Sequence, residues 1–193
     1  MVHGHLAESQ HEVEYTLKTW GCRPFEWFKR HRLLGKRFYF AHCIHLNEEE
    51  IAQMAETGTG VAHCPISNML LSSGACPVPS YLEHGLTRIG LGVDGAASSN
   101  SSNMLEEIRC AYLLNRLTWG DKAATPDDYL YMATAGGAKV LGRDDIGYLA
   151  PGMAADFAQM DWNQLTYAGG CYDPVACIVE SGDPRLVKNV VVN

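Results

Sequence analysis

Three short segments of this sequence carry residue types that could activate water for hydrolysis. They are His5-Leu6-Ala7-Glu8, Ala41-His42-Cys43-Ile44-His45 and Gly92-Val93-Asp94-Gly95. Histidine and aspartate bind divalent metals in hydrolytic sites, and a carboxylate three residues beyond such a ligand is placed to move protons. The segments together predict a metal-dependent hydrolytic site built from His5, Glu8, His42 and Asp94.

Each of these residues alone also has an ordinary structural explanation. A single His at a strand end usually makes one structural hydrogen bond, and an Asp before Gly, as at Asp94, often supports a turn. His42 is favoured over His45 because it lies nearer the end of the preceding apolar run. His63, followed by Cys64-Pro65, fits a core or loop position better than a ligand position. The combination is therefore more specific than any single member.

Short apolar runs, typical of buried parallel strands, accompany these segments. The runs are Val2–Leu6, Phe38–Ala41, Gly60–His63 and Ile89–Val93. Helical patterns separate or follow them, at Ser9–Trp20, at Pro24, after the capping box Asn47-Glu48-Glu49-Glu50, at Pro77–His84 and at Met104–Thr118. Because the carboxyl ends of parallel strands meet at one edge of a sheet, we expect the site residues to converge there.

The alternation of strands and helices predicts the α/β fold class, and the number of strand–helix units leaves two possible arrangements of the strands. Four units end near Thr118, which is half of a (β/α)8 barrel, and a small open doubly wound sheet would use the same four strands. After Gly142 the sequence becomes rich in turns and in short strand-like runs, at Ala155–Met160, Val175–Val179 and Val187–Val192. We therefore predict an α/β unit over residues 1–142 and a β-rich segment over residues 143–193.

Proline and glycine residues are expected to limit the helices at two places. Pro65 is expected to exclude a helix directly after it, which leaves Ser67-Asn68 in a polar turn. Thr125-Pro126 starts a further helical region, and Gly136-Gly137 is expected to divide that region into two short helices.

The composition is that of an ordinary globular chain. Its 193 residues are 47% hydrophobic and 19% charged, which is enough for one sizeable core. The net charge of -7, without a prominent Lys/Arg run, argues against nucleic acid or an anionic membrane as a partner. No apolar stretch approaches the roughly 20 residues of a membrane span, and the first residues do not resemble a signal peptide. The seven cysteines, without a CxxC pair, are expected to be reduced, buried thiols of a cytoplasmic protein.

The ordered set of motifs resembles the second half of the amidohydrolase superfamily, in the branch that acts on purines, pyrimidines and triazines. The motifs are His3–Glu8, Ala41–Leu46, His63–Asn68 and Gly92–Ser98. Two later segments, Ile146–Asp156 and Ala168–Ala176, are most similar to the 8-oxoguanine deaminases within that branch. The resemblance covers essentially the whole chain.

This resemblance implies a distorted TIM barrel with a composite β-sandwich and one divalent metal, most often zinc and sometimes iron. The chain would supply barrel strands 5–8 and part of the sandwich. The implied roles are metal ligand for His5, proton shuttle for Glu8, contact with the attacking water or substrate for His42, and both metal ligand and proton acceptor for Asp94. Substrate contacts are expected from His63, Asn68 and Ser98.

The implied reaction is the hydrolytic deamination of a small heterocyclic amine, with 8-oxoguanine converted to urate and ammonia. A triazine hydrolase, an isocytosine deaminase or an adenosine-type deaminase would use the same four groups. The resemblance also implies a homo-oligomer when the protein is full length.

One family feature has no counterpart in this sequence. The family also binds its metal through a His-x-His pair at the end of barrel strand 1. His3-x-His5 has that form, but Glu8 marks it as the strand 5 element. We therefore expect the chain to be the carboxyl-terminal part of a longer enzyme. A non-catalytic fragment or binding domain is the alternative from a different functional class.

Overall fold

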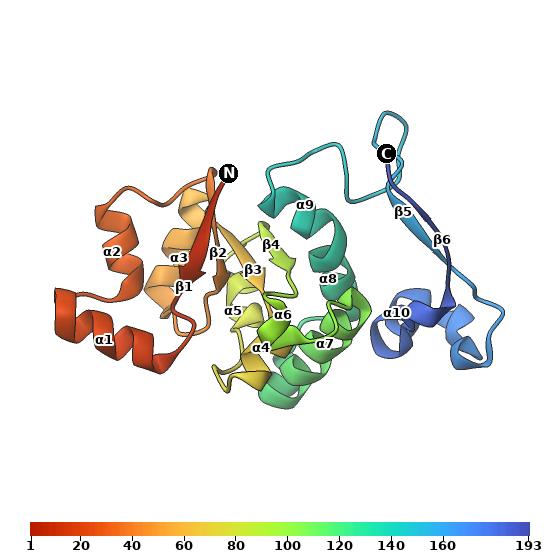
Figure 1. Cartoon of the computed structure of the whole chain (residues 1–193), viewed down its shortest axis with the longest axis horizontal. Coiled ribbons are helices and arrows are strands. Elements are labelled where there is room, and N and C mark those ends of the chain that lie inside the picture. The colour runs from red at the N-terminus through yellow and green to blue at the C-terminus, as the bar shows by residue number, and fades with distance from the viewer.

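The structure is a computed structural model that describes all 193 residues. At its centre lies a sheet of four parallel strands (Figure 1). The strands are β1 (Val2–Leu6), β2 (Phe38–His42), β3 (Gly60–His63) and β4 (Ile89–Leu91). They pair in the order β1-β2-β3-β4. A doubly wound sheet reverses its strand order at a switch point, whereas a barrel adds each strand beside the previous one. The sequential order therefore rules out the doubly wound alternative.

Helices connect the strands. α1 (Gln10–Trp20) and α2 (Pro24–Arg30) lie between β1 and β2, α3 (Glu48–Thr57) precedes β3, and α4 (Pro65–Leu70) and α5 (Val78–Glu83) precede β4. The capping box predicted before α3 is confirmed, with Asn47 accepting from the Glu50 amide and Glu50 accepting from the Asn47 amide. Gly58 ends that helix with a φ of 70°. Glycine adopts this left-handed conformation without steric cost.

The prediction of a polar turn after Pro65 is wrong, because α4 begins at Pro65 itself. Proline disfavours helix at the residue before it, but at the first helical position its missing N–H is not needed. Ser67 and Asn68 therefore lie in a buried helical turn.

The region after β4 is helical, with α6 (Ala96–Ser99), α7 (Met104–Trp119), η1 (Gly120–Lys122), α8 (Pro126–Tyr131), the π-helical turn η2 (Met132–Gly136) and α9 (Gly137–Val140). The predicted break at Gly136-Gly137 is wrong, because η2 joins α8 to α9 without interruption. These glycines allow a close approach to β4. A Cβ at Gly136 would collide with the carbonyl oxygen of Ile89, and a Cβ at Gly90 would lie 2.8 Å from the Cα of Gly137.

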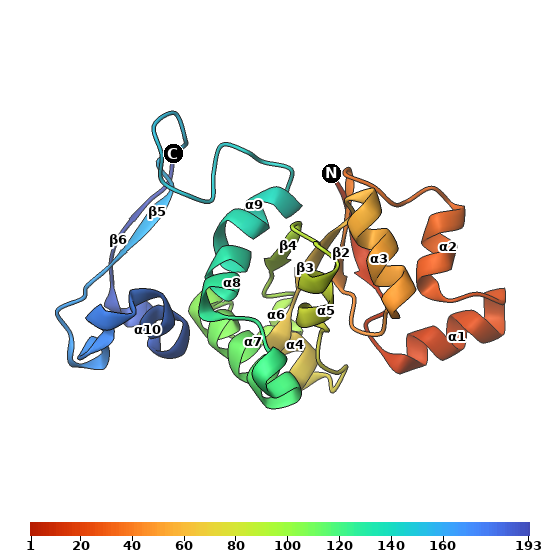
Figure 2. The same cartoon turned by 180° about the vertical axis from the view of Figure 1, so that it is seen from behind.

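The last part of the chain holds a two-stranded antiparallel sheet of β5 (Phe157–Met160) and β6 (Val187–Val191) at the end farthest from α1 (Figure 1). Between these strands lie η3 (Leu165–Tyr167), η4 (Gly170–Tyr172), α10 (Pro174–Ser181) and η5 (Pro184–Leu186). The predicted strand over Val175–Val179 is wrong, because these residues form α10, which packs against α7 and α8 (Figure 2). Asp173 caps this helix and Pro174 occupies its first position. The apolar residues at Val175–Val179 are therefore explained by the packing of this helix against α7 and α8.

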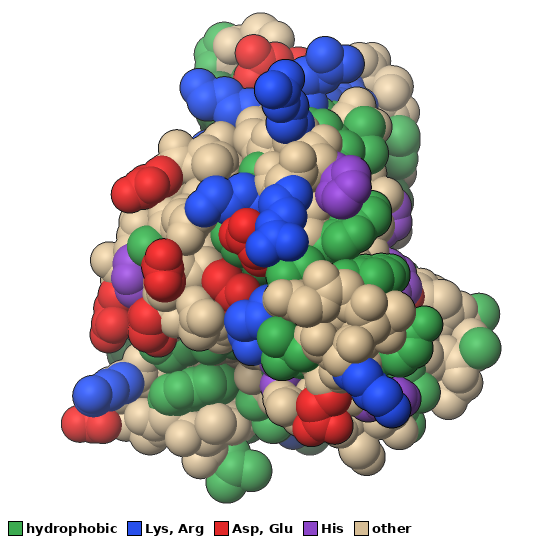
Figure 3. Space-filling model, turned by 90° about the vertical axis from the view of Figure 1, so that its left-hand side faces the viewer, with side chains coloured by type: hydrophobic (Ala, Val, Ile, Leu, Met, Phe, Trp, Pro, Cys, Tyr) green, Lys and Arg blue, Asp and Glu red, His purple; other side chains and the backbone are tan.

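The core contains one inward residue from each strand of the parallel sheet, namely Leu6, Phe40, Val61 and Ile89. Tyr81 from α5 and Met132 from η2 close the same cluster. No helix combines the length and the apolar character needed to cross a membrane. On the face formed by the amino-terminal helices, Lys and Arg side chains lie among Asp and Glu side chains (Figure 3), so neither sign of charge dominates that face.

All seven cysteines are unpaired, but the expectation that all are buried is wrong for three of them. Cys110 and Cys177 are half-buried, and Cys171 is exposed.

Candidate active site

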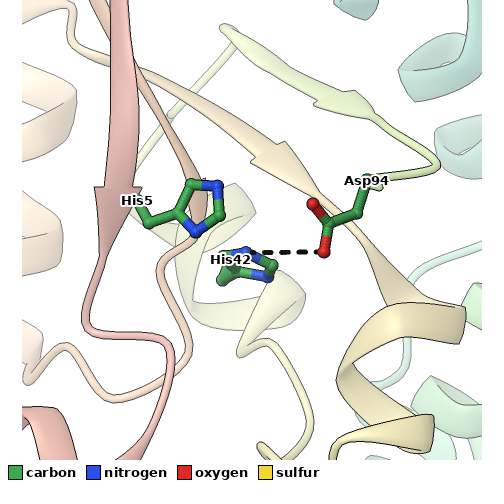
Figure 4. Close-up of side chains that lie close together, drawn as sticks. All are labelled: His5, His42 and Asp94. Atoms are coloured by element: carbon green, nitrogen blue, oxygen red, sulfur yellow. Dashed lines mark ion pairs between the residues drawn. The ribbon is translucent and has the colours of Figure 1, made fainter. Parts of the chain in front are cut away.

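Three of the residues placed in one site by the sequence meet at the carboxyl edge of the parallel sheet (Figure 4). His5 comes from β1, His42 ends β2, and Asp94 follows β4. One nitrogen or oxygen atom of each lies within 4.8 Å of the others. The Nε2 atom of His42 is 4.0 Å from Oδ2 of Asp94, and the rings of His5 and His42 meet edge to face with centroids 4.7 Å apart.

The backbone at this edge adopts unusual conformations that aim the side chains. His42 has a φ of 68° and Asp94 a φ of 60°, and Ala7 and Cys43 are also left-handed. His42 is in register with Leu6, whereas His5 is in register with Ala41. Since side chains alternate along a strand, a regular β2 would point His42 away from the face of His5. The left-handed turn accounts for their meeting, at a cost of order 1 kcal/mol or more for each such residue.

Asp94 is held by two serine hydroxyls on the same oxygen. Ser67 Oγ donates to Oδ2 at 2.6 Å and Ser98 Oγ donates to it at 3.0 Å. Burial on its own would raise the pKa of Asp94, but these hydrogen bonds, the Gly95 amide and the nearby His42 bring it below the ordinary value. Asp94 is therefore a carboxylate at neutral pH, with its second oxygen not bound by these serines.

His42 has one anchored nitrogen and one unsatisfied nitrogen. Nδ1 lies 2.8 Å from Oδ1 of Asn68, and both side chains are fully buried. With Asn68 accepting, the hydrogen is on Nδ1 and the lone pair is on Nε2. Nε2 is buried and has no hydrogen-bond partner. A buried lone pair beside a carboxylate and a second imidazole suits a cation or a donor molecule, so this donor set fits a divalent metal such as zinc.

Glu8 lies beside both histidines. Its Oε2 atom is 3.7 Å from Nδ1 of His5 and 3.7 Å from Nε2 of His42. Its Oε1 atom accepts a long hydrogen bond of 3.4 Å from Ser73 Oγ. The carbonyl of Ser73 in turn lies 2.7 Å from Nε2 of His45. His45 therefore supports the loop that contacts Glu8 and is not a member of the three-residue cluster.

His63 ends β3 and is buried, with no hydrogen-bond partner for its Nδ1 atom. Burial and the neighbouring His42 lower the pKa of His63 to about 3, so it is neutral at physiological pH. The other two residues expected to contact the substrate are engaged with the site itself, Asn68 with His42 and Ser98 with Asp94.

Sequence reasoning missed Ser67 and Ser73, although they touch Asp94 and Glu8. For Ser67 a signal was present, because it follows a strand end and a proline by a few residues. Ser73 lies in an irregular loop between α4 and α5, where no periodic pattern identifies a contact.

A cavity of about 530 Å³ lies elsewhere, between the start of α7 and η5. The edge that carries the site is open, and 52% of the His5 side chain is exposed.

Comparisons with known proteins agree on one family. The model of the amidohydrolase family matches residues 1–193. The chain is 45% identical to the 8-oxoguanine deaminase of Pseudomonas aeruginosa, covering 98% of this chain and 42% of that protein. It is 39% identical to the 5-methylthioadenosine/S-adenosylhomocysteine deaminase of Pelotomaculum thermopropionicum, covering 100% of this chain and 44% of that protein.

A similar solved structure is an adenosine deaminase from Xanthomonas campestris with bound zinc. The TM-score is 0.94 at 32% sequence identity, and the match covers 99% of this chain and 44% of that one. The chain thus spans less than half the length of the relatives it matches.

Proposed function

The chain belongs to the amidohydrolase family, and we propose that it supplies part of the active site for metal-dependent hydrolytic deamination of a heterocyclic amine. The observation that carries this proposal is the meeting of His5, His42 and Asp94 around a buried, unsatisfied Nε2 atom. Glu8 adds a proton-transfer group within 3.7 Å of both histidines.

His5 and Asp94 would hold the metal, zinc in the first instance and iron as the alternative. When bound, the metal supplies a Lewis acid that allows water to react near neutral pH. The remaining ligands would come from residues outside this chain, as the family resemblance implies. Two donors of the required type support this assignment, one imidazole nitrogen of His5 and one carboxylate oxygen of Asp94.

The residues of this chain would then divide the proton transfers between them. Asp94 takes the proton from the attacking water, and the water oxygen forms a bond with the amidine carbon of the ring. Glu8 delivers a proton to the ring nitrogen and regains one from the hydroxyl that the water has become. Asp94 passes the proton it took from the water to the departing amine, so the carbon–nitrogen bond breaks and ammonia leaves. His42, with its ring fixed by Asn68, accepts a hydrogen bond through the Nε2 lone pair from the attacking water and then from the hydroxyl of the tetrahedral centre.

The substrate that the relatives support best is 8-oxoguanine, with urate and ammonia as products. The 45% identity with an 8-oxoguanine deaminase favours it. His63 would face the substrate as a neutral imidazole, whereas Asn68 and Ser98 would act on it only through His42 and Asp94. An adenosine-type substrate is the second candidate, because a 5-methylthioadenosine/S-adenosylhomocysteine deaminase and an adenosine deaminase are similar over the same residues.

We also propose that β1–β4 are strands 5–8 of a (β/α)8 barrel, that residues 1–142 form its second half, and that residues 143–193 belong to a β-sandwich. The sequential parallel order of the strands supports this assignment. The whole enzyme would act on a small molecule as a homo-oligomer. Seven unpaired thiols fit a reducing cytoplasm.

The test uses the complete protein, stripped of metal and then reloaded with zinc. Ammonia release is measured from 8-oxoguanine, adenosine, 5-methylthioadenosine and a triazine. We expect turnover of 8-oxoguanine that disappears with the metal and returns with zinc. Preferential turnover of adenosine or its thioether would identify the second candidate. A protein that binds no metal and releases no ammonia would be a binding domain, and the proposal would be wrong.

A further inference from the structure

Glu107 of α7 is a fully buried carboxylate without a cationic partner. The charged groups near it are Glu106 and Asp94, which are both acidic. Its Oε2 atom accepts a hydrogen bond of 3.1 Å from the amide of Ile66, and its Oε1 atom accepts one of 3.2 Å from Ser99 Oγ. Burying a carboxylate without a counter-ion is costly, so its presence here calls for a reason beyond packing.

The two donors to Glu107 adjoin the two serines that hold Asp94. Ile66 precedes Ser67, and Ser99 follows Ser98, and both of these serine hydroxyls donate to Oδ2 of Asp94. Glu107 thus joins the turn after β3 to the turn after β4. Each of these turns supplies one of the two serine hydroxyls that donate to Asp94.

The same turn after β3 also holds His42. The first turn of α4 contains Ile66, Ser67 and Asn68 in succession. Glu107 accepts a hydrogen bond from the Ile66 amide. The Ser67 hydroxyl donates to Asp94, and the side-chain oxygen of Asn68 contacts Nδ1 of His42. α4 has only six residues, so its own hydrogen bonds give it little independent stability.

We infer that Glu107 is a positioning residue that sets the geometry of Asp94 and His42 through the first turn of α4 and through Ser99. The inference rests on the proposed function of the site. Residues that orient metal ligands from outside typically change metal affinity or activity by about 10- to 100-fold when they are replaced. A purely structural role would lower stability and leave both quantities unchanged.

The test compares three substitutions in the complete protein. Glu107→Met keeps the length of the side chain but removes both acceptors. Glu107→Gln keeps both contacts, because its amide oxygen can accept from Ile66 while its amide nitrogen donates to the Ser99 hydroxyl. Glu106→Met is the matched control, since Glu106 is the neighbouring exposed residue and its side chain accepts a hydrogen bond from Ser101 and none from α4 or Ser99.

Three quantities are measured, namely the zinc dissociation constant, kcat and KM for deamination, and the 15N NMR shifts of the His42 ring in metal-free protein. For Glu107→Met we expect the zinc dissociation constant to rise by about 10- to 100-fold and kcat to fall more than KM changes. The His42 ring shifts should also move. For Glu107→Gln and Glu106→Met all three should stay close to wild type.

A folded Glu107→Met protein with wild-type zinc affinity, kcat and His42 shifts would overturn the inference, even if its melting temperature fell. If Glu107→Met does not fold, Ser99→Ala replaces it, and unchanged zinc affinity and His42 shifts in that variant would overturn the inference. The shift measurement needs no metal. Failure of the wild-type protein to bind zinc therefore counts against the proposed function, while the His42 shifts still decide the role of Glu107.

Discussion

Asn68 Oδ1 lies 2.8 Å from His42 Nδ1, and neither side chain is exposed to solvent. The two residues come from different strand–helix units and are 26 positions apart in the sequence. Their contact leaves only Nε2 of His42 free to act at the site. Asn68 thus determines which nitrogen of the catalytic candidate carries the hydrogen.

Replacement of this anchor should impair the site more than the fold. Asn68→Leu leaves Nδ1 of His42 buried without a partner, which should destabilise the protein by about 1–3 kcal/mol. Loss of ring orientation should lower kcat by about 10- to 100-fold, in the range seen for residues that orient site groups. Asn68→Asp keeps an acceptor for Nδ1 but adds a buried charge, so it separates loss of orientation from a change of charge beside His42. Normal kcat in Asn68→Leu would show that the contact has no part in turnover.

Glu8→Gln tests the proton-transfer role in the complete protein. Glu8 lies beside both histidines but is assigned to proton transfer, so the variant should keep its zinc and lose about 10²–10⁴-fold in kcat. Metal analysis and ammonia release measure the two effects separately. Glu14→Gln is the control, because Glu14 lies on the exposed face of α1 and its side chain accepts a hydrogen bond from Gln10, away from the site. Zinc loss in Glu8→Gln would make Glu8 a ligand, and near-normal turnover would remove it from the mechanism.

His63 should make stability depend on pH. Its pKa is about 3 in the folded chain because of burial, against 6.5 for an ordinary histidine. Between these values the unfolded chain binds a proton that the folded chain does not, so stability falls as the pH drops below 6.5. The slope from this residue is at most about 1.4 kcal/mol per pH unit. Denaturant unfolding of metal-free protein at several pH values measures it.

His63→Gln should flatten that dependence, whereas His11→Gln, at an exposed position, should not. Equal slopes for wild type and His63→Gln would contradict the burial of a neutral imidazole at the end of β3.

Much of the barrel-like unit could be predicted because its signals are local. The apolar runs before His42 and Asp94 and the capping box at Asn47 depend only on neighbouring residues, and the structure contains the corresponding elements. The strand expected at Val175–Val179 failed because a short apolar run fits a buried helix equally well. The break expected at Gly136 failed because close packing on β4 explains the glycine better than flexibility does.

The residues of the candidate site also differ in how far the sequence could predict them. His5 and Asp94 could be found because strand ends converge by topology. Glu107 could not, since its contact with Ile66 joins residues 41 positions apart and depends on the final packing of α4 against α7. The left-handed backbone at His42 is likewise fixed by the folded structure.

Arg23 should be important for stability at the edge of the site. Its guanidinium donates to both carboxylate oxygens of Glu50, at 2.7 and 2.8 Å, and to the carbonyl of His45 at 2.6 Å. Arg23→Met leaves the largely buried Glu50 without its partner, and we expect a loss of about 2–3 kcal/mol in unfolding free energy. Arg30→Met, which breaks the exposed pair with Glu26, should lose less than about 1 kcal/mol. Equal losses of unfolding free energy for the two variants would show that the burial of Glu50 does not strengthen its contribution to stability.

Asp94→Asn should be the most damaging single change, because Asp94 is assigned both to hold the metal and to accept a proton. The amide oxygen can still touch a metal, but it carries no charge and cannot take a proton at neutral pH. The Ser67 and Ser98 hydroxyls can turn to accept from the new amide, so the fold should be almost unaffected. Zinc content, melting temperature and ammonia release from 8-oxoguanine are measured on the complete protein.

We expect reduced zinc, a melting temperature close to wild type, and a larger loss of turnover than in Glu8→Gln or His42→Asn. If Asp94 were only a turn residue, Asn would support the turn nearly as well, and both zinc and turnover would be preserved. The two serines argue against that reading, because a turn residue needs no pair of hydroxyls on one oxygen to hold its carboxylate. Full zinc with normal ammonia release would remove Asp94 from the site and, with it, the main support for hydrolytic deamination by this edge of the sheet.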